Sequence, residues 1–357
     1  MFISALGAIS GKSNRLGFPK ANKVCVILVD GLGSENIRAA AGHAPFLNSA
    51  LRGSKSVNSV FPTTTAAAIT SFAVGAAPSD HGIIGYSVFD RKTGLVRNLL
   101  TGWDESFEPD VYQKLPSVSQ LAIEAGVASF TVGPEEYSQS GFTQLTMSSA
   151  SYVPAKTFED RTRAVRSILA SKQKSLTYLY YPELDSIAHS HGGGSFEWLA
   201  KIEDLDGEIK KLVTELPSDT AVLLTADHGI VDVPREEQIY LDEYSIDGLI
   251  AVTGDPRNTF LYFEPEVNLD ATTLELQNLL PDSVHVFSVE DLVSLGWLDR
   301  EVANPEFLPD LFLVSSGKHA CYHRGFCKPQ SLRMIGQHGG ISTAELSVPL
   351  LRFGCFA

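Results

Sequence analysis

The stretch Val24-Cys-Val-Ile-Leu-Val29, followed at once by Asp30, decides the fold class of this chain. A continuous apolar run of this length is typical of a strand that is buried on both faces of a parallel sheet. Two further acids follow apolar runs in the same way, namely Asp185 after residues 176–181 and Asp227 after residues 221–226. The carboxyl ends of strands in an open α/β sheet border the crevice where ligands bind, so we expect the three acids to meet there.

Short apolar runs alternate with helix-like stretches through the first two thirds of the chain. The pattern predicts strands at residues 24–29, 57–61, 128–132, 176–181 and 221–226, and helices at residues 34–41, 66–74, 118–125, 161–171 and 196–216. Such alternation favours an α/β fold with a central, mostly parallel sheet that helices flank on both faces.

The pattern changes after Asp232. Strands are predicted at residues 248–252, 259–264, 284–287 and 310–314, and helices at residues 272–280 and 289–295. We therefore expect a small α+β insertion over residues 233–331 and a catalytic core built from residues 1–232 and 332–357. Residues 347–353 are expected to close the central sheet.

The composition limits the classes of partner. The chain has 357 residues, of which 44% are apolar, so it can bury a sizeable core, and its net charge is −14. This acidic balance argues against a nucleic-acid groove and against an anionic membrane surface. No apolar run approaches the roughly 18 residues that a membrane-spanning helix needs, so we expect no membrane partner.

The N-terminus and the cysteines bear on location. Residues 1–7 lack both a basic segment and a long apolar segment, which predicts that there is no signal peptide. Four scattered cysteines favour reduced thiols over disulfides. We therefore expect a cytoplasmic protein, and the sequence leaves its oligomeric state open.

Histidines accompany the acids. On a helix, Asp185 and His189 would share a face because they are four residues apart. Adjacent residues such as Asp227 and His228 can both face one ion only where the chain bends from a strand into a loop. His338, near the C-terminus, is flanked by glycine-containing segments. Each of these signals is weak alone, since capping acids and loop histidines are common. Together with the acid after the first strand they supply six N and O ligands, too many for one tetrahedral zinc ion and about right for two.

A candidate nucleophile lies in the sequence between Asp30 and the later acid and histidine motifs, in Phe61-Pro-Thr-Thr-Thr65-Ala-Ala-Ala. A threonine here would stand at a helix N-terminus, where free N–H groups and the helix dipole favour phosphate. A metal ion would be needed to make its hydroxyl a good nucleophile. The alternative is that Thr63, Thr64 and Thr65 only cap the helix.

The order of the motifs resembles the alkaline phosphatase superfamily, most closely its nucleotide pyrophosphatase/phosphodiesterase branch. The likeness rests on Val-Asp30-Gly-Leu, Phe61-Pro-Thr-Thr-Thr65, Pro78-Ser-Asp-His-Gly-Ile-Ile-Gly85, Glu183-Leu-Asp185-Ser-Ile-Ala-His189, Thr225-Ala-Asp227-His228-Gly229 and Gly336-Gln-His338-Gly. It implies an alkaline-phosphatase-like sheet between helices, with a cap inserted before the last histidine.

The resemblance also implies two divalent metal ions and assigns their ligands. One ion would be held by Asp185, His189 and His338, and the other by Asp30, Asp227, His228 and Thr65. Thr65 is the nucleophile because it matches the last threonine of the family's Pro-Thr-x-Thr pattern, with Thr63 and Thr64 as fallback candidates. Zinc is preferred for a mixed His/Asp set, although manganese or iron would be tolerated.

The sequence departs from the branch where the substrate would bind. Ala66 and its neighbours replace the Phe-Pro-Asn that usually follows the nucleophile, which removes one wall of the usual nucleobase stack. Tyr180 matches a tyrosine that forms another wall. Tyr86 replaces an asparagine that normally donates a hydrogen bond to a phosphoryl oxygen, and a phenol can also donate.

These patterns together predict a two-metal hydrolase of phosphate esters. The favoured activity is that of a phosphodiesterase or nucleotide pyrophosphatase acting through a covalent phosphothreonine, on a small phosphorylated substrate such as a nucleotide. Two alternatives stay open. The first is a phosphomonoesterase or phosphonoacetate-type hydrolase on the same metals, and the second is a metal-binding homologue without turnover.

Overall fold

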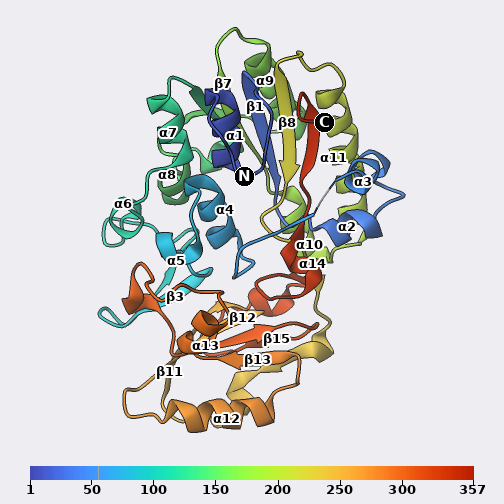
Figure 1. The fold of residues 1–357 in the computed structure, drawn as a ribbon. Coiled ribbons are helices and arrows are strands. Elements are labelled where there is room, and N and C mark those ends of the chain that lie inside the picture. Colours follow the sequence, from blue (N-terminus) through green and yellow to red (C-terminus); the bar gives the residue numbers. More distant parts are fainter. Residues whose placement is uncertain (55) are drawn as a thin grey trace.

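The computed structural model describes residues 1–54 and 56–357 and is built around a six-stranded sheet (Figure 1). The strand order is β18-β8-β1-β7-β5-β6, and only β18 runs antiparallel to its neighbour. The six strands are β1 (Lys23–Val29), β5 (Ala128–Gly133), β6 (Ser151–Pro154), β7 (Ser175–Tyr181), β8 (Thr220–Thr225) and β18 (Leu351–Gly354). The prediction of an α/β fold with a central, mostly parallel sheet is therefore confirmed.

Strand β1 lies in the interior of the sheet, between β7 and β8. Its side chains alternate between two hydrophobic cores. Val24, Val26 and Leu28 belong to one core, whereas Cys25, Ile27 and Val29 belong to the other. Because both faces of the strand are buried, the sequence is apolar throughout, without the polar alternation of a half-exposed strand.

Helices cover both faces of this sheet, as Figure 1 shows. One core contains side chains of α1 (Phe2–Ser10), α4 (Thr65–Val74), α7 (Val118–Glu124) and α8 (Gly141–Met147). The other core contains side chains of α2 (Ser34–Ala39), α3 (Pro45–Arg52), α9 (Phe158–Ala170) and α11 (Phe196–Thr214). The sheet is thus the middle layer of three.

A second, antiparallel sheet lies beyond one end of the central sheet (Figure 1). Its strand order is β11-β12-β14-β13, formed by β11 (Leu249–Asp255), β12 (Asn258–Phe263), β13 (Val284–Phe287) and β14 (Leu311–Ser315), with the helices α12 (Leu269–Leu279) and α13 (Val289–Ser294). The hairpin β3 (Ser87–Asp90) and β4 (Leu95–Asn98) packs beside β11. The boundaries 233–331 for the insertion stay a prediction.

The remaining elements are short. They are α5 (Pro78–His81), α6 (Pro109–Tyr112), α10 (Glu183–His191), α14 (Thr343–Leu346), β2 (Val57–Asn58), β9 (Val231–Asp232), β10 (Gln238–Tyr240), β15 (Ala320–Tyr322), β16 (Gly336–Gln337), β17 (Ser347–Val348) and the 3₁₀ turns at Glu135–Tyr137, Arg235–Glu237, Leu241–Glu243, Pro305–Phe307 and Ser331–Arg333.

Two predicted elements differ from the structure. The strand predicted at residues 57–61 covers only Val57–Asn58, because this edge segment pairs with the equally short β17. The segment 347–353 divides into β17 and β18, so only its second half joins the central sheet. The helix α1 escaped prediction because almost all of its residues are buried, which leaves no polar face in the sequence.

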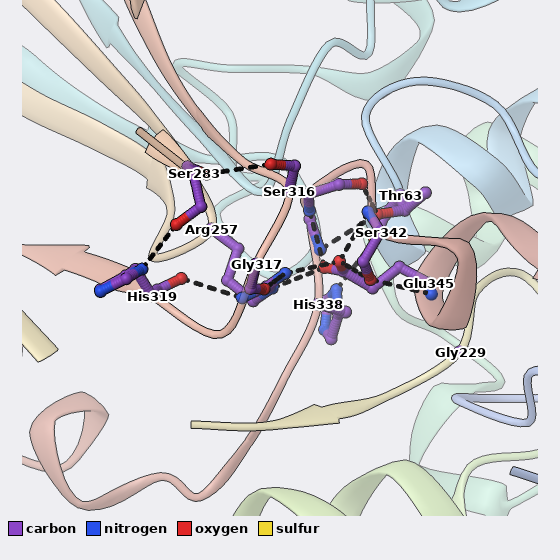
Figure 2. A network of polar contacts seen from close by, with 12 residues as sticks. Thr63, Gly229, Arg257, Ser283, Ser316, Gly317, His319, His338, Ser342 and Glu345 are labelled. Atoms are coloured by element: carbon purple, nitrogen blue, oxygen red, sulfur yellow. Dashed lines mark hydrogen bonds and ion pairs between the residues drawn. The ribbon is translucent and has the colours of Figure 1, made fainter. Parts of the chain in front are cut away.

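A buried ion pair joins the second sheet to the core. Arg257, in the turn between β11 and β12, makes two hydrogen bonds of 2.7 Å to the carboxylate of Glu345 on α14, and both side chains are fully buried. The guanidinium also donates to the carbonyl oxygens of Gly317 and His319, as Figure 2 shows. Glu345 in turn accepts from the backbone N–H of Gly340. The pair therefore connects the turn between β11 and β12, the loop that contains Gly317 and His319, and the segment from Gly340 to α14.

We expect Glu345→Gln to lower the free energy of unfolding by about 3–5 kcal/mol, because it leaves the Arg257 guanidinium buried without a counter-charge. Urea unfolding monitored by circular dichroism would measure the change. Glu275→Gln, at an exposed position of α12, is the matched control and should change little. Equal stabilities of the two variants would contradict the role assigned to the pair.

Candidate metal centre and nucleophile

The three acids that follow the apolar strands meet at one edge of the central sheet. Asp30 directly follows β1, Asp227 follows β8 after one intervening residue, and Asp185 lies in the first turn of α10 after β7. Because β1 pairs with β7 and β8 in parallel, the three strand ends lie side by side. Asp30 and Asp227 are buried, and Asp185 is half-buried.

One group of ligand atoms consists of Asp185, His189 and His338. Its ligand atoms all lie within 4.8 Å of one another. The helix α10 places Asp185 Oδ2 3.1 Å from His189 Nε2, one helical turn away. His338 reaches the same place from the loop after β16, and its ring centroid lies 5.3 Å from that of His189.

A second group converges on His228 Nε2. This nitrogen lies 3.5 Å from Asp30 Oδ1, 3.5 Å from Asp227 Oδ2 and 3.1 Å from Thr65 Oγ1. Ligand atoms of Asp30, Asp185 and His228 also lie within 4.8 Å of one another. The half-buried Asp185 is therefore within reach of both groups, and the two groups adjoin.

Backbone carbonyls orient all three histidines. The Nδ1 atoms lie 2.7 Å from Gly336 O in His189, 3.0 Å from Thr63 O in His338, and 3.3 Å from Gly229 O in His228. A proton on each Nδ1 would be donated to its carbonyl, which leaves each Nε2 as a lone-pair donor. Histidines that bind metals usually have their other ring nitrogen held in this way.

The carboxylates fit divalent cations. Asp30 Oδ1, Asp185 Oδ1 and Asp227 Oδ2 are buried, and none has a hydrogen-bond partner within the described part of the chain. Burial, with Asp227 and Asp185 nearby, raises the pKa of Asp30 well above its usual range, and burial also raises the pKa of Asp227. Buried oxygens that lack partners and repel one another are stabilised by bound cations. The donor set therefore fits two metal ions.

The three threonines lie in different surroundings. Thr65 is the first residue of α4, and its hydroxyl is the one near His228. The hydroxyl of Thr63 donates to Gly340 O at 2.7 Å, and that of Thr64 donates to Asp255 Oδ1 at 3.3 Å. Thr64 stands at the N-cap of α4 but its side chain accepts no capping bond, so the first N–H groups of the helix lack a side-chain cap. This arrangement supports Thr65 over the two fallback candidates and over a purely capping role.

Two glycines permit the strand ends to meet. Gly31, after Asp30, has a φ of 73°, which a residue with a side chain rarely adopts. A Cβ atom on Gly229 would lie 1.9 Å from Ala344 O, so a side chain there would push the α14 loop away. Gly31 is therefore required for its backbone conformation beside Asp30, and Gly229 for close backbone approach beside His228.

The two tyrosines predicted to contact substrate lie in different cavities. Tyr180 donates a hydrogen bond from its hydroxyl to Asp30 Oδ2, and it lines a cavity of about 590 Å³ with Trp103 and Tyr137. Tyr86 lines a different cavity of about 380 Å³ together with Asp255. Their contacts with substrate stay predictions, and the bond from Tyr180 to a candidate metal ligand was not foreseen.

Asp255 is a buried acid that the sequence analysis missed. It ends β11, accepts from Thr64 and from the backbone N–H of Tyr86, and burial raises its pKa to about 7. A weak signal was present, because Asp255 comes three residues after the predicted strand of residues 248–252. That predicted strand stops three residues short of the end of β11, which is Asp255 itself.

No helix in residues 1–54 and 56–357 is both long enough and apolar enough to cross a membrane.

Comparisons with known proteins identify the family of this chain. The sequence model of the family described as type I phosphodiesterase / nucleotide pyrophosphatase matches residues 24–311. The human ectonucleotide pyrophosphatase/phosphodiesterase family member 1 is 24% identical over 74% of this chain, and human family member 5 is 25% identical over 53%. The aligned regions span 28% and 41% of the length of these relatives.

Solved structures share the fold. Murine ectonucleotide pyrophosphatase/phosphodiesterase 5 superposes with a TM-score of 0.72 at 18% identity, covering 93% of this chain and 88% of that chain. An inactive form of the same murine protein in complex with AMP gives a TM-score of 0.73 at 19% identity, with the same coverage.

We expect two divalent ions per chain after loading with zinc, measured by elemental analysis of the dialysed protein. His338→Ala should retain about one ion, because it removes a ligand from the group that contains His189. His43→Ala is the control, since His43 pairs with Glu203 on the surface. Two retained ions in the His338 variant would contradict the assignment.

Proposed function

Because this chain belongs to the type I phosphodiesterase/nucleotide pyrophosphatase family, we propose that it is a two-metal hydrolase of phosphate esters. The favoured substrates are phosphodiesters or nucleotide pyrophosphates. The observation that carries the proposal is that the Thr65 hydroxyl, at the start of α4, lies 3.1 Å from His228 Nε2, beside the buried Asp30 and Asp227 and the half-buried Asp185. Binding of AMP is a property of the murine relative, and it supports a nucleotide substrate only by analogy.

The N-terminus of α4 and the candidate metal ligands would bind different parts of a phosphoryl group. The first N–H groups of α4 face the end of the helix and, with the helix dipole, favour the phosphoryl oxygens. Asp185, His189 and His338 would hold one divalent ion, and Asp30, Asp227, His228 and Thr65 the other. When bound, the ions would supply Lewis acidity that favours the ionised threonine and offsets charge on the phosphoryl oxygens.

The proposed reaction proceeds in two displacements at phosphorus. Thr65 Oγ1 forms a bond to phosphorus while the bond to the leaving alcohol or phosphate breaks, which gives a phosphothreonine. Water then attacks the same phosphorus, the Thr65 Oγ1–phosphorus bond breaks, and the hydroxyl is restored. Thr65 releases its proton to solvent when it ionises, the leaving group takes up a proton from solvent, and the attacking water supplies the proton that restores the Thr65 hydroxyl. The buried His228, whose Nε2 lies 3.1 Å from Thr65 Oγ1, would orient the hydroxyl for the first attack.

Zinc is the proposed metal, because the centre combines imidazole nitrogens with carboxylate oxygens. Manganese and iron suit the same donors. X-ray fluorescence scans across the manganese, iron and zinc absorption edges, taken from crystals grown without added metal, would distinguish the three elements.

A cytoplasmic location also remains a proposal. It is supported by the four free cysteines in the described residues, two of which are buried. The names of the relatives describe ectoenzymes, so fractionation of the source cells is the measurement that decides.

We expect Thr65→Ala to reduce kcat by about 10³-fold or more while metal content is retained, because the nucleophile is lost and the acids and histidines remain. Thr65→Ser should keep part of the activity, since it retains a hydroxyl at the same atom. Thr70→Ala is the matched control, because Thr70 lies on the same helix and its hydroxyl only donates to Ala66 O. Full turnover of the Thr65→Ala variant would exclude this nucleophile.

A paired assay separates the candidate activities. With bis(4-nitrophenyl) phosphate and 4-nitrophenyl phosphate, we expect kcat/KM to be higher for the diester. The reverse preference would favour the monoesterase alternative, and release of phosphate from phosphonoacetate would favour a phosphonoacetate-type hydrolase. A zinc-loaded protein that hydrolyses none of them would support a homologue without turnover.

A further inference from the structure

We propose that Asp255 determines the charge selectivity of the reactive centre, so that a phosphoryl group with one negative charge binds better than one with two. The inference rests on the proposed function, since it concerns the same phosphoryl site. It addresses the choice between diesters and monoesters, which neither the fold nor the ligand set decides.

The position of Asp255 is fixed from two sides. Thr64 Oγ1 donates to its Oδ1 at 3.3 Å, and the backbone N–H of Tyr86 donates to its Oδ2 at 3.3 Å. The residue is only 5% exposed. Both donors stabilise the ionised carboxylate, and the ion pairs of the described chain do not include Asp255. Within the described residues its negative charge therefore has no ion-pair partner within 4 Å, although, against the rise that burial causes, the nearby His189 lowers the pKa of Asp255.

The carboxylate also lies next to the segments that form the reactive centre. Its partner Thr64 directly precedes Thr65. A Cβ atom on Gly339, which follows His338, would lie 2.9 Å from Asp255 Cβ. Asp255 thus stands between the segment that carries the nucleophile and the segment that carries a candidate metal ligand.

The carboxylate faces open space as well as the protein. Asp255 lines the cavity of about 380 Å³, together with Tyr86, Asn98 and Thr259.

Coulomb repulsion then favours the substrate with less charge. A phosphodiester carries one negative charge, whereas a monoester or inorganic phosphate carries about two at pH 8.5. At an effective dielectric constant near 20, one additional unit charge at several ångströms changes a binding constant by about tenfold or more. The Tyr86 N–H donates to Asp255, so it is not free to bind a third phosphoryl oxygen.

The test compares binding of inorganic phosphate with binding of dimethyl phosphate by calorimetry, using the zinc-loaded Thr65→Ala protein at pH 8.5. Asp255→Asn removes the charge and keeps the shape. We expect it to tighten dimethyl phosphate about tenfold and inorganic phosphate about a hundredfold, so that the preference between them changes about tenfold, because the repulsion is proportional to the charge of the ligand. Asp255→Glu should restore the preference of the parent protein. In the turnover-competent chain, the ratio of monoester to diester kcat/KM should rise by about the same factor in Asp255→Asn.

The matched control is Asp310→Asn, because Asp310 also accepts from a backbone N–H, that of Phe263, but pairs with Arg91 away from the threonines. It should leave both affinities unchanged. The inference is overturned if Asp255→Asn shifts both ligands equally, shifts neither, or loses its zinc, since each result indicates a merely structural role. Absence of turnover in the parent chain would refute the proposed function instead, and the binding comparison would still decide the role of Asp255.

Discussion

Three carboxylates at the ends of adjacent parallel strands are the constraint on which the rest of the structure depends. Asp30, Asp185 and Asp227 each have one buried oxygen without a partner in the described residues, and their proximity raises the pKa of Asp30 well above its usual range, in addition to the effect of burial. Such a cluster is unfavourable without cations. The surroundings are arranged accordingly, since three histidines direct their Nε2 atoms toward it and hold Nδ1 against backbone carbonyls.

The second sheet contributes to this centre although it lies beyond the end of the first (Figure 1). Its turn residue Arg257 binds Glu345, and Glu345 holds the N–H of Gly340. Gly340 O accepts from Thr63, whose carbonyl faces His338 Nδ1 (Figure 2). The candidate metal ligand His338 and the segment that carries the candidate nucleophile are thus held by one buried polar network that spans both sheets. An unpaired polar group in a buried network raises the free energy of the folded state. Each of these buried groups is therefore expected to keep its hydrogen-bond partner.

Much of this arrangement was predictable from the sequence. Strands 24–29, 176–181 and 221–226 are apolar because both faces of each are buried, and their common direction brings the acids that follow them together. The spacing of Asp185 and His189 predicted their shared helix face. The contacts of Asp255 and Glu345 were not predictable, because they depend on how a second sheet docks. The edge strand at residues 57–61 was overestimated, since only two of its residues find a partner.

Charge accounting explains why one additional acid near Thr65 matters. Two divalent cations would bring four positive charges, and the three clustered carboxylates with an ionised threonine would bring four negative charges. A centre that is neutral in sum attracts a phosphoryl group mainly through local donors, such as the first N–H groups of α4. Because the charges of the metals and their ligands would sum to zero, no excess positive charge would offset the negative charge of Asp255. Its effect on a dianion is then larger than it would be in a centre rich in lysine or arginine.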